Sequence, residues 1–352
     1  MRTLTFFLSL FIPALGAAQS ATLPLTRAIE AELERLPART AVYLKHLKTG
    51  DEVAIRADDP FNSQSVIKIP IMVRAFQLAE AGKLNLGERF TIGRAELRDG
   101  TGVLQYTDYA DGGLAPTIRD LIQQMIITSD NTATDLMTTK VGGVEALNAW
   151  LAQSGYRMRM VNRGWEYRRK LLARLDARFA SITAEEVTGL QYAMSDNPLF
   201  AHYRDLFTGP RAEWVDVVRN PGNRRTQSEN QRRLMVEDRD IWLGEMTARD
   251  IGRMLEAIER ETIASPASAA TMRIFMRRQL AGSRRLPHFV DVPVAHKTGD
   301  SANIANDVGI IYARSGPIVI AVMVNGITGS FGEAEDRIGR IAQVVVNHFD
   351  QR

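Results

Sequence analysis

The chain has 352 residues, of which 45% are hydrophobic and 24% charged. This is the composition of an ordinary globular protein, and it excludes a disordered chain, a collagen-like chain and a polytopic membrane protein. The absence of cysteine rules out disulfides, thiolate zinc sites and a cysteine nucleophile. Five scattered histidines lack metal-binding spacing, so we expect neither a metal nor a cofactor. A formal charge of +3 does not indicate nucleic-acid binding.

Residues 1–18 have the pattern of an export signal. Arg2 supplies the positive start, residues 4–15 form an apolar run, and Gly16-Ala17-Ala18 resembles a small-residue cleavage site. The run is too short to span a bilayer, and no cysteine follows that could carry a lipid. We therefore expect a periplasmic or secreted protein of residues 19–352 without stable membrane insertion. The alternative is a buried N-terminal core helix.

Strand patterns lie near both ends of the mature chain, and helical patterns fill the middle. Two short runs at 41–47 and 52–57, joined by a Gly50-Asp51 turn, predict a β-hairpin. Helical periodicity dominates from about 65 to 287. The other predicted elements are helices at 26–36 and 333–348 and strands at 292–296, 308–313 and 318–324.

This order predicts an α+β fold. One antiparallel sheet of about five strands would be flanked by the terminal helices, with an all-helical subdomain inserted. We assign the sheet part to about 19–62 and 288–352 and the helical part to about 63–287, with an insert at about 167–245. Residues 219–233, within this insert, are polar, basic and turn-rich, and we expect them to form an exposed loop.

The first motif with catalytic potential is Ser65-Val66-Ile67-Lys68, at the start of a predicted helix. Residues three apart share a helix face, so the Lys68 amine can reach the Ser65 hydroxyl. Serine is a weak nucleophile that needs an adjacent base, and a partly desolvated lysine can supply one. Taken alone, a capping serine and a solvated lysine explain this pattern better.

Two further motifs follow in the chain. Ser129-Asp130-Asn131 lies between two amphipathic patterns, in a turn that can face a cleft, although these residue types are also favoured helix caps. Lys297-Thr298-Gly299 ends the strand that begins near Val292. On an edge strand, these residues can dock an extended acyl substrate and its carboxylate, whereas the alternative is a protective charged edge with a glycine bulge. All three motifs in this order rarely arise by chance, which favours catalysis.

With this combination the chain resembles the penicillin-recognising serine enzymes, and most closely the class A β-lactamases, whose motifs are SxxK, SDN and KTG. The resemblance extends over nearly the whole mature chain and includes residues 246–259 and 265–276. It implies that Ser65 attacks the lactam carbonyl, that Lys68 takes part in the activation of Ser65, and that Ser129 relays a proton to the leaving nitrogen.

The resemblance also implies how the substrate is held. Asn131 would position the substrate's side-chain amide. Lys297, Thr298 and Gly299 would form the edge strand that binds its carboxylate. The backbone N–H groups of Ser65 and Asp300 would form the oxyanion hole.

Class A members use a glutamate to activate the water that hydrolyses the acyl-enzyme. The resemblance gives this role to Glu166, which follows Asn131 at about the family's interval, with Glu229 as a rival. Lys170 replaces the family's asparagine, and Asn306 stands where many members have a carboxylate-binding arginine. The basic residues of this region, which we expect to form a solvated face, are Arg168, Arg169, Lys170 and Arg174.

The function that the resemblance implies is a serine β-lactamase, acting on penicillins or cephalosporins through an acyl-enzyme on Ser65. A peptidoglycan D,D-peptidase, or a related penicillin-binding acyl hydrolase with slow deacylation, is the first alternative. A non-catalytic penicillin-binding module is the second. We expect a small-molecule β-lactam substrate as the partner, and no nucleic acid.

Overall fold

The computed structural model describes residues 15–107, 113–195, 207–219 and 224–351, together with residues 197, 200, 203 and 205. The first fourteen residues of the expected export signal lie outside the described residues. Helix α1 (Leu15–Leu33) includes the expected cleavage region, so it begins earlier than the helix predicted from residue 26. Within these ranges, no helix combines the length and apolar character that a bilayer span requires.

Five antiparallel strands form the main sheet in the order β2-β1-β8-β7-β6. The predicted N-terminal hairpin is confirmed, with Val42 opposite Ile55, and β1 also pairs with β8 through Arg39 opposite Asn325. Strand β6 lies at the sheet edge and extends through the whole Lys-Thr-Gly motif. The α+β fold with a five-stranded antiparallel sheet is thereby confirmed. The strands are β1 (Arg39–His46), β2 (Glu52–Ile55), β6 (Val294–Ser301), β7 (Ile304–Ala313) and β8 (Gly316–Asn325).

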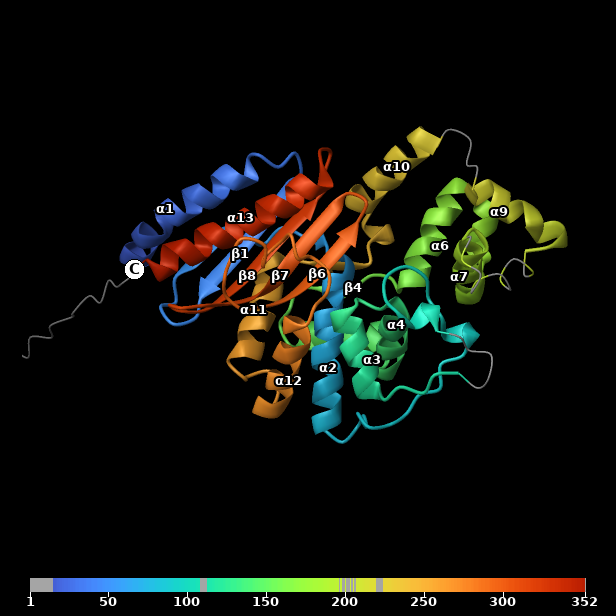
Figure 1. Ribbon diagram of the computed structural model, residues 1–352, viewed down its shortest axis with the longest axis horizontal. Helices are drawn as coiled ribbons and strands as arrows, with labels where there is room; N and C mark the ends of the chain where they lie inside the picture. The colour runs from blue at the N-terminus through green and yellow to red at the C-terminus, as the bar shows by residue number, and fades with distance from the viewer. Residues whose placement is uncertain are drawn as a thin grey trace, which may run out of the picture.

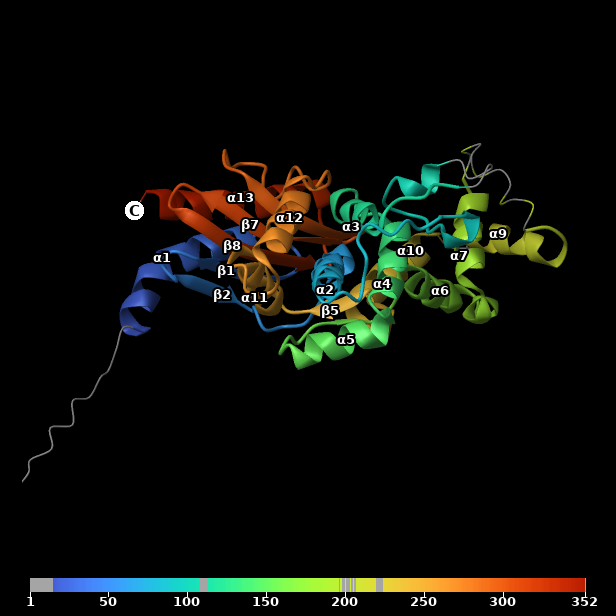
Figure 2. The same ribbon diagram turned by 90° about the horizontal axis from the view of Figure 1, so that it is seen from below.

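Helices cover both faces of this sheet (Figures 1 and 2). On one face α1 packs beside α13 (Phe331–Asp350), which buries an apolar stripe of both terminal helices against the strands. On the other face lie α11 (Ala248–Glu259) and α12 (Pro266–Arg277). Helix α11 approaches the sheet so closely that a Cβ atom at Gly252 would lie 2.2 Å from the Tyr43 ring.

The central helical part contains α2 (Lys68–Glu80), α3 (Ile118–Ile127), α4 (Asn131–Lys140) and α5 (Gly143–Gln153). A second sheet, which the sequence did not predict, pairs three very short strands in the order β3-β5-β4. Two or three residues are too few to show the alternation that identifies a strand. These strands are β3 (Phe61–Asn62), β4 (Arg159–Met160) and β5 (Gly244–Met246).

The helical insert begins after β4 and ends before β5, so the pairing of these strands holds its two ends together. Its helices are α6 (Gly164–Leu175), α7 (Ala184–Ala193), α9 (Ala212–Arg219) and α10 (Arg224–Glu237). The first three form a group at the end of the molecule away from α1 and α13 (Figure 1). This group has its own apolar cluster, which includes Leu172, Phe179, Leu190 and Phe207.

The loop predicted at residues 219–233 is wrong over most of its length, because Arg224–Arg233 belongs to helix α10. The polar sequence lacks an apolar stripe in this part of the helix, so its periodicity gave no helical signal. The helix is fixed instead by tertiary contacts. Asn62 Nδ2 donates to the Met235 carbonyl at 2.9 Å, and Asn303 Nδ2 donates to the Arg232 carbonyl at 3.0 Å.

Candidate active site

Ser65 lies in a 3₁₀ turn, Gln64–Ile67, that runs directly into helix α2. Buried side chains of Val66 and Ile67 anchor this turn, while Ser65 remains partly exposed and lines a cleft of about 390 Å³. Gln64 has a left-handed backbone with φ of +46°, a conformation that typically costs on the order of 1 kcal/mol outside glycine. The fold therefore tolerates local strain in order to present Ser65 to the cleft.

Strand β6 passes very close to the turn that carries Ser65. A Cβ atom at Gly299 would lie 2.3 Å from the Ser63 carbonyl oxygen and 3.1 Å from the Val66 nitrogen. Only glycine permits this approach, so the glycine of the Lys-Thr-Gly motif is needed for packing, and no bulge is required to explain it. Thr298 and Asp300, its neighbours on β6, line the same cleft as Ser65.

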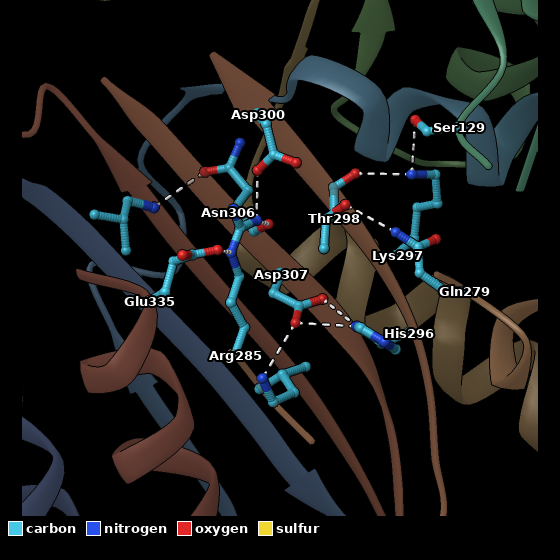
Figure 3. Close-up of polar contacts among 12 residues, drawn as sticks. Ser129, Gln279, Arg285, His296, Lys297, Thr298, Asp300, Asn306, Asp307 and Glu335 are labelled. Carbon is cyan, nitrogen blue, oxygen red and sulfur yellow. Dashed lines mark hydrogen bonds and ion pairs between the residues drawn. The ribbon is translucent and has the colours of Figure 1, made fainter. Parts of the chain in front are cut away.

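Two buried lysines converge on the hydroxyl of Ser129. Lys68 Nζ donates to Ser129 Oγ at 3.0 Å, to the Ser129 carbonyl at 2.6 Å and to Asn131 Oδ1 at 3.0 Å. Lys297 Nζ donates to the same Ser129 Oγ at 3.0 Å (Figure 3). No hydrogen bond joins Lys68 to Ser65 in the described part of the chain, so the direct contact expected from helical spacing is replaced by a contact with Ser129.

Burial shifts the acid–base behaviour of both lysines. It lowers the pKa of Lys68 well below its usual value, and the nearby charge of Lys297 lowers it further. Burial also lowers the pKa of Lys297 to about 8, against the opposing effect of Asp300 and Asp307. A lowered pKa favours the neutral amine of Lys68, and a neutral amine can accept a proton as a general base.

The middle residue of the Ser-Asp-Asn motif has a structural role. The buried Asp130 carboxylate caps helix α4 by accepting from Ala133 N at 2.9 Å. Its other oxygen accepts from the backbone nitrogens of Val103 and Leu104 at 2.8 and 2.9 Å, which holds the turn of residues 100–104 at the cleft rim. Asn131 extends this link, because its Nδ2 donates to the Asp99 carbonyl at 2.9 Å.

A polar network supports strand β6 from behind (Figure 3). The buried Arg285 forms an ion pair with Asp300 at 2.5 Å and another with Glu335 at 3.2 Å. Beside it, His296 Nδ1 lies 2.9 Å from the Asp307 carboxylate, and the Gln279 amide lies 2.8 Å from Thr298 Oγ1. These contacts fix the side chains and the backbone direction of the Lys-Thr-Gly segment.

Asn306 occupies the position where many class A members have a carboxylate-binding arginine, but it is fully buried and does not line the cleft. Its Nδ2 donates to the carbonyls of Asn62 and Ser63, and its Oδ1 accepts from Val324 N and Asn325 Nδ2. Asn306 therefore connects the sheet to the chain just before Ser65.

The structure does not bring Glu166 to Ser65. The Glu166 carboxylate turns back to accept from Arg163 N at 2.8 Å, which caps the start of helix α6. Lys170 points away as well and donates to the Asp240 carbonyl. The rival Glu229 is exposed on α10 and lines a separate groove of about 570 Å³, outside the cleft that holds Ser65.

Instead, other charged residues lie beside Lys68. A small cavity of about 20 Å³ adjoins it, a volume that suits a single water molecule. Its walls include Asn131, which the sequence marked as a site residue, and three charged residues that it did not mark, namely Asp99, Asp135 and Arg168. The periodicity of α6 could have marked Arg168, since Gly164 and Leu171 share its helix face and also line the cleft.

The expected solvated face of α6 is therefore wrong for Arg168, which lines the cleft and forms an ion pair with Asp99. Arg174 pairs with Asp238 at 2.8 Å, and Arg169 stacks over the Trp165 ring at 5.3 Å.

The model of the β-lactamase enzyme family matches residues 24–349. The extended-spectrum β-lactamase PER-1 of Pseudomonas aeruginosa is 22% identical over 302 residues, covering 83% of this chain and 77% of that protein. Among solved structures, the extended-spectrum β-lactamase TLA-1 aligns with a TM-score of 0.68 at 18% identity, covering 94% of this chain and 99% of TLA-1. PBP-A aligns with a TM-score of 0.64 at 21% identity, covering 94% and 97%. With its three motifs assembled around one cleft and the family match spanning almost its whole length, this chain belongs to the β-lactamase enzyme family.

Proposed function

We propose that this protein is a serine β-lactamase that opens the β-lactam ring through an acyl-enzyme on Ser65. The observation that carries the proposal is the continuous buried chain of hydrogen bonds from Lys68 through Ser129 to Lys297, beside an accessible serine. The curated relatives that match the chain include several β-lactamases, PER-1 among them, which supports the same substrate class.

In the acylation step, neutral Lys68 takes the proton of Ser65 as Ser65 Oγ bonds to the lactam carbonyl carbon. Lys68 then passes a proton to Ser129 Oγ, 3.0 Å away, and Ser129 delivers its own proton to the nitrogen of the breaking C–N bond. The Lys297 ammonium and the Thr298 hydroxyl hold the substrate carboxylate. The close approach of β6 to the turn of Ser65 supports an oxyanion hole formed by the backbone N–H groups of Ser65 and Asp300.

After this transfer Lys68 is neutral again. A water entering the adjoining small cavity could then be deprotonated by Lys68 and attack the ester of the acyl-enzyme. Because Glu166 caps its own helix, this route uses no glutamate, and we expect hydrolysis of the acyl-enzyme to be slower than its formation.

The position of Glu166 also favours a second candidate function, a D,D-peptidase or related penicillin-binding hydrolase with very slow deacylation. A mutant of PBP-A, one of the structural neighbours, has been solved as an acyl-enzyme complex with penicillin G. The two candidates share acylation of Ser65 and differ in the fate of the adduct.

Turnover of a chromogenic cephalosporin by the purified protein separates the candidates. A β-lactamase gives sustained, multiple-turnover hydrolysis after an initial burst, and a Ser65→Ala variant gives none. A burst of one equivalent without further hydrolysis would favour the peptidase. An absence of both burst and turnover would contradict either function.

We also propose that the chain is exported, which the pattern of residues 1–18 supports. N-terminal sequencing of protein recovered from a periplasmic fraction tests this proposal. The expected first residue is Gln19, and recovery of the uncleaved chain from the cytoplasm would contradict it.

A further inference from the structure

Arg168 is a cation of the cleft that no step of the proposed mechanism uses. It projects from the first turns of α6, and its partly exposed side chain lines the same cleft as Ser65, Ser129 and Thr298. The helix that carries it belongs to the long insert. The insert therefore supplies part of the lining of this cleft. Strand β6, which carries the Lys-Thr-Gly motif, supplies another part.

Asp99 holds the Arg168 guanidinium from the protein interior. The two side chains form an ion pair in which Asp99 is the more deeply buried partner. Asp99 lines the small inner cavity and not the open cleft, whereas Arg168 lines both. Within the described ranges, one N–H group of Arg168 is engaged by Asp99, and its other donors form no hydrogen bond to the protein. The guanidinium is thus fixed on its inner side, with donors remaining for a ligand in the cleft.

The position of these donors indicates which part of a substrate they would meet. A Cβ atom built on Gly100 would lie 2.7 Å from Arg168 Nη2 and 2.7 Å from Asn131 Nδ2, so both nitrogens border the same point of the cleft rim. Asn131 is the residue expected to position the acyl side chain of the substrate. In a substrate complex with Asn131 in that role, the Arg168 guanidinium would lie beside the acyl side chain, whereas Lys297 and Thr298 would hold the ring carboxylate.

We propose that Arg168 is a specificity-determining residue that binds a carboxylate carried on the acyl side chain of the substrate. A planar guanidinium matches a carboxylate with two parallel hydrogen bonds, and a side chain already held by Asp99 loses little conformational freedom on binding. The substrate class is then an acyl compound with two carboxylates, one at Lys297 and Thr298 and one at Arg168. This inference rests on the proposed function, acylation of Ser65.

Two penicillins that differ by one carboxylate test the inference. Carbenicillin is benzylpenicillin with an added carboxylate on the α-carbon of its side chain. The second-order rate constant for acylation of Ser65 is measured with each drug by intact-protein mass spectrometry, and their ratio is compared between variants. We expect Arg168→Gln to lower the carbenicillin to benzylpenicillin ratio by about tenfold or more, the effect of one charge-assisted hydrogen bond. Arg168→Lys should retain a ratio between those of the wild type and Arg168→Gln.

Arg169→Gln is the matched control, since it removes the same charge one residue along α6 from a side chain that stacks on Trp165 outside the cleft. It should leave the ratio unchanged. Because Arg168→Gln strands the buried Asp99 carboxylate and can destabilise the fold, the double variant Asp99→Asn/Arg168→Gln is measured beside it. The double variant should show the same lowered ratio.

The possible outcomes separate the two proposals. Acylation by both penicillins with a ratio unchanged in Arg168→Gln and in the double variant overturns the role of Arg168 and leaves the proposed function intact. If neither penicillin acylates Ser65 in the wild type, both proposals are overturned.

Discussion

Lys68 and Lys297 share a single acceptor, the Oγ atom of Ser129, each at 3.0 Å. Two ammonium groups so close together, both fully buried, repel each other and lose hydration, and both effects lower the pKa of Lys68. Under the proposed function, Lys68 gives up its proton and acts as the base, while Lys297 stays charged and binds the substrate carboxylate.

The pH dependence of acylation should report both lysines. Lys68 acts as a neutral amine, so the rate constant rises with pH as Lys68 loses its proton. Lys297 acts as an ammonium, so the rate constant falls again as pH rises through its pKa of about 8. We expect a bell-shaped profile of acylation by benzylpenicillin. In Lys297→Arg the alkaline limb should move to higher pH, because guanidinium keeps its proton. An alkaline limb that stays near pH 8 in this variant would assign it to another group.

Loss of the Lys68 amine should slow both chemical steps. A general base typically contributes about 10²- to 10⁴-fold to a rate, and the same amine is proposed to act in acylation and in deacylation. We therefore expect Lys68→Met to lower the acylation rate constant by about that factor, and to leave whatever adduct forms more stable than in the wild type. Stopped-flow mixing with a chromogenic cephalosporin measures both phases. Circular dichroism establishes that the variant is folded, and wild-type deacylation in a folded variant would exclude Lys68 from the second step.

Glu166 should contribute to stability rather than to hydrolysis of the adduct. Its carboxylate accepts from Arg163 N at the start of α6, and loss of such a cap costs about 1 kcal/mol. We expect Glu166→Ala to lower the free energy of unfolding by about this amount, while its deacylation rate constant stays close to the wild-type value. Urea unfolding and mass spectrometry of the adduct measure the two quantities. An adduct trapped in Glu166→Ala would instead show that Glu166 turns into the cleft during the reaction.

Gly299 should tolerate no side chain. A methyl group there would meet the Ser63 carbonyl at 2.3 Å, so Gly299→Ala must push β6 away from the turn that carries Ser65. We expect a loss of stability of about 1–3 kcal/mol and a large fall in the acylation rate constant, since the two walls of the cleft separate. Gly87→Ala is the control, because Gly87 is exposed and its nearest neighbour would lie 3.4 Å from the new methyl group. If the two variants had the same stability and the same acylation rate constant, the close approach of β6 to the turn that carries Ser65 would be refuted.

The sheet and the three motifs could be predicted from the sequence because their signals are local. Strands such as β7 and β8 are long apolar runs, and Ser65, Ser129 and Lys297 lie in short patterns that need no knowledge of distant residues. Helix α10 has no such local signal. Its C-terminal half is held by Asn62 and Asn303, which lie far away in the chain, and such contacts cannot be read from the local sequence.

Side-chain direction could not be predicted in the same way. The resemblance implied that Glu166 faces the cleft, but the direction of its carboxylate depends on a cap whose N-cap residue, Arg163, is not a usual capping type. The role of Arg168 was hidden for a similar reason, since its partner Asp99 lies 69 residues earlier in the chain.

The most direct test of the account is mass spectrometry of the protein after brief exposure to benzylpenicillin, followed by peptide mapping. We expect the intact chain to gain the mass of one penicillin molecule, carried by the peptide that contains Ser65, and the gain to disappear with time as the ester is hydrolysed. An adduct on any other residue, or no adduct under conditions in which the drug is consumed, would contradict the central claim.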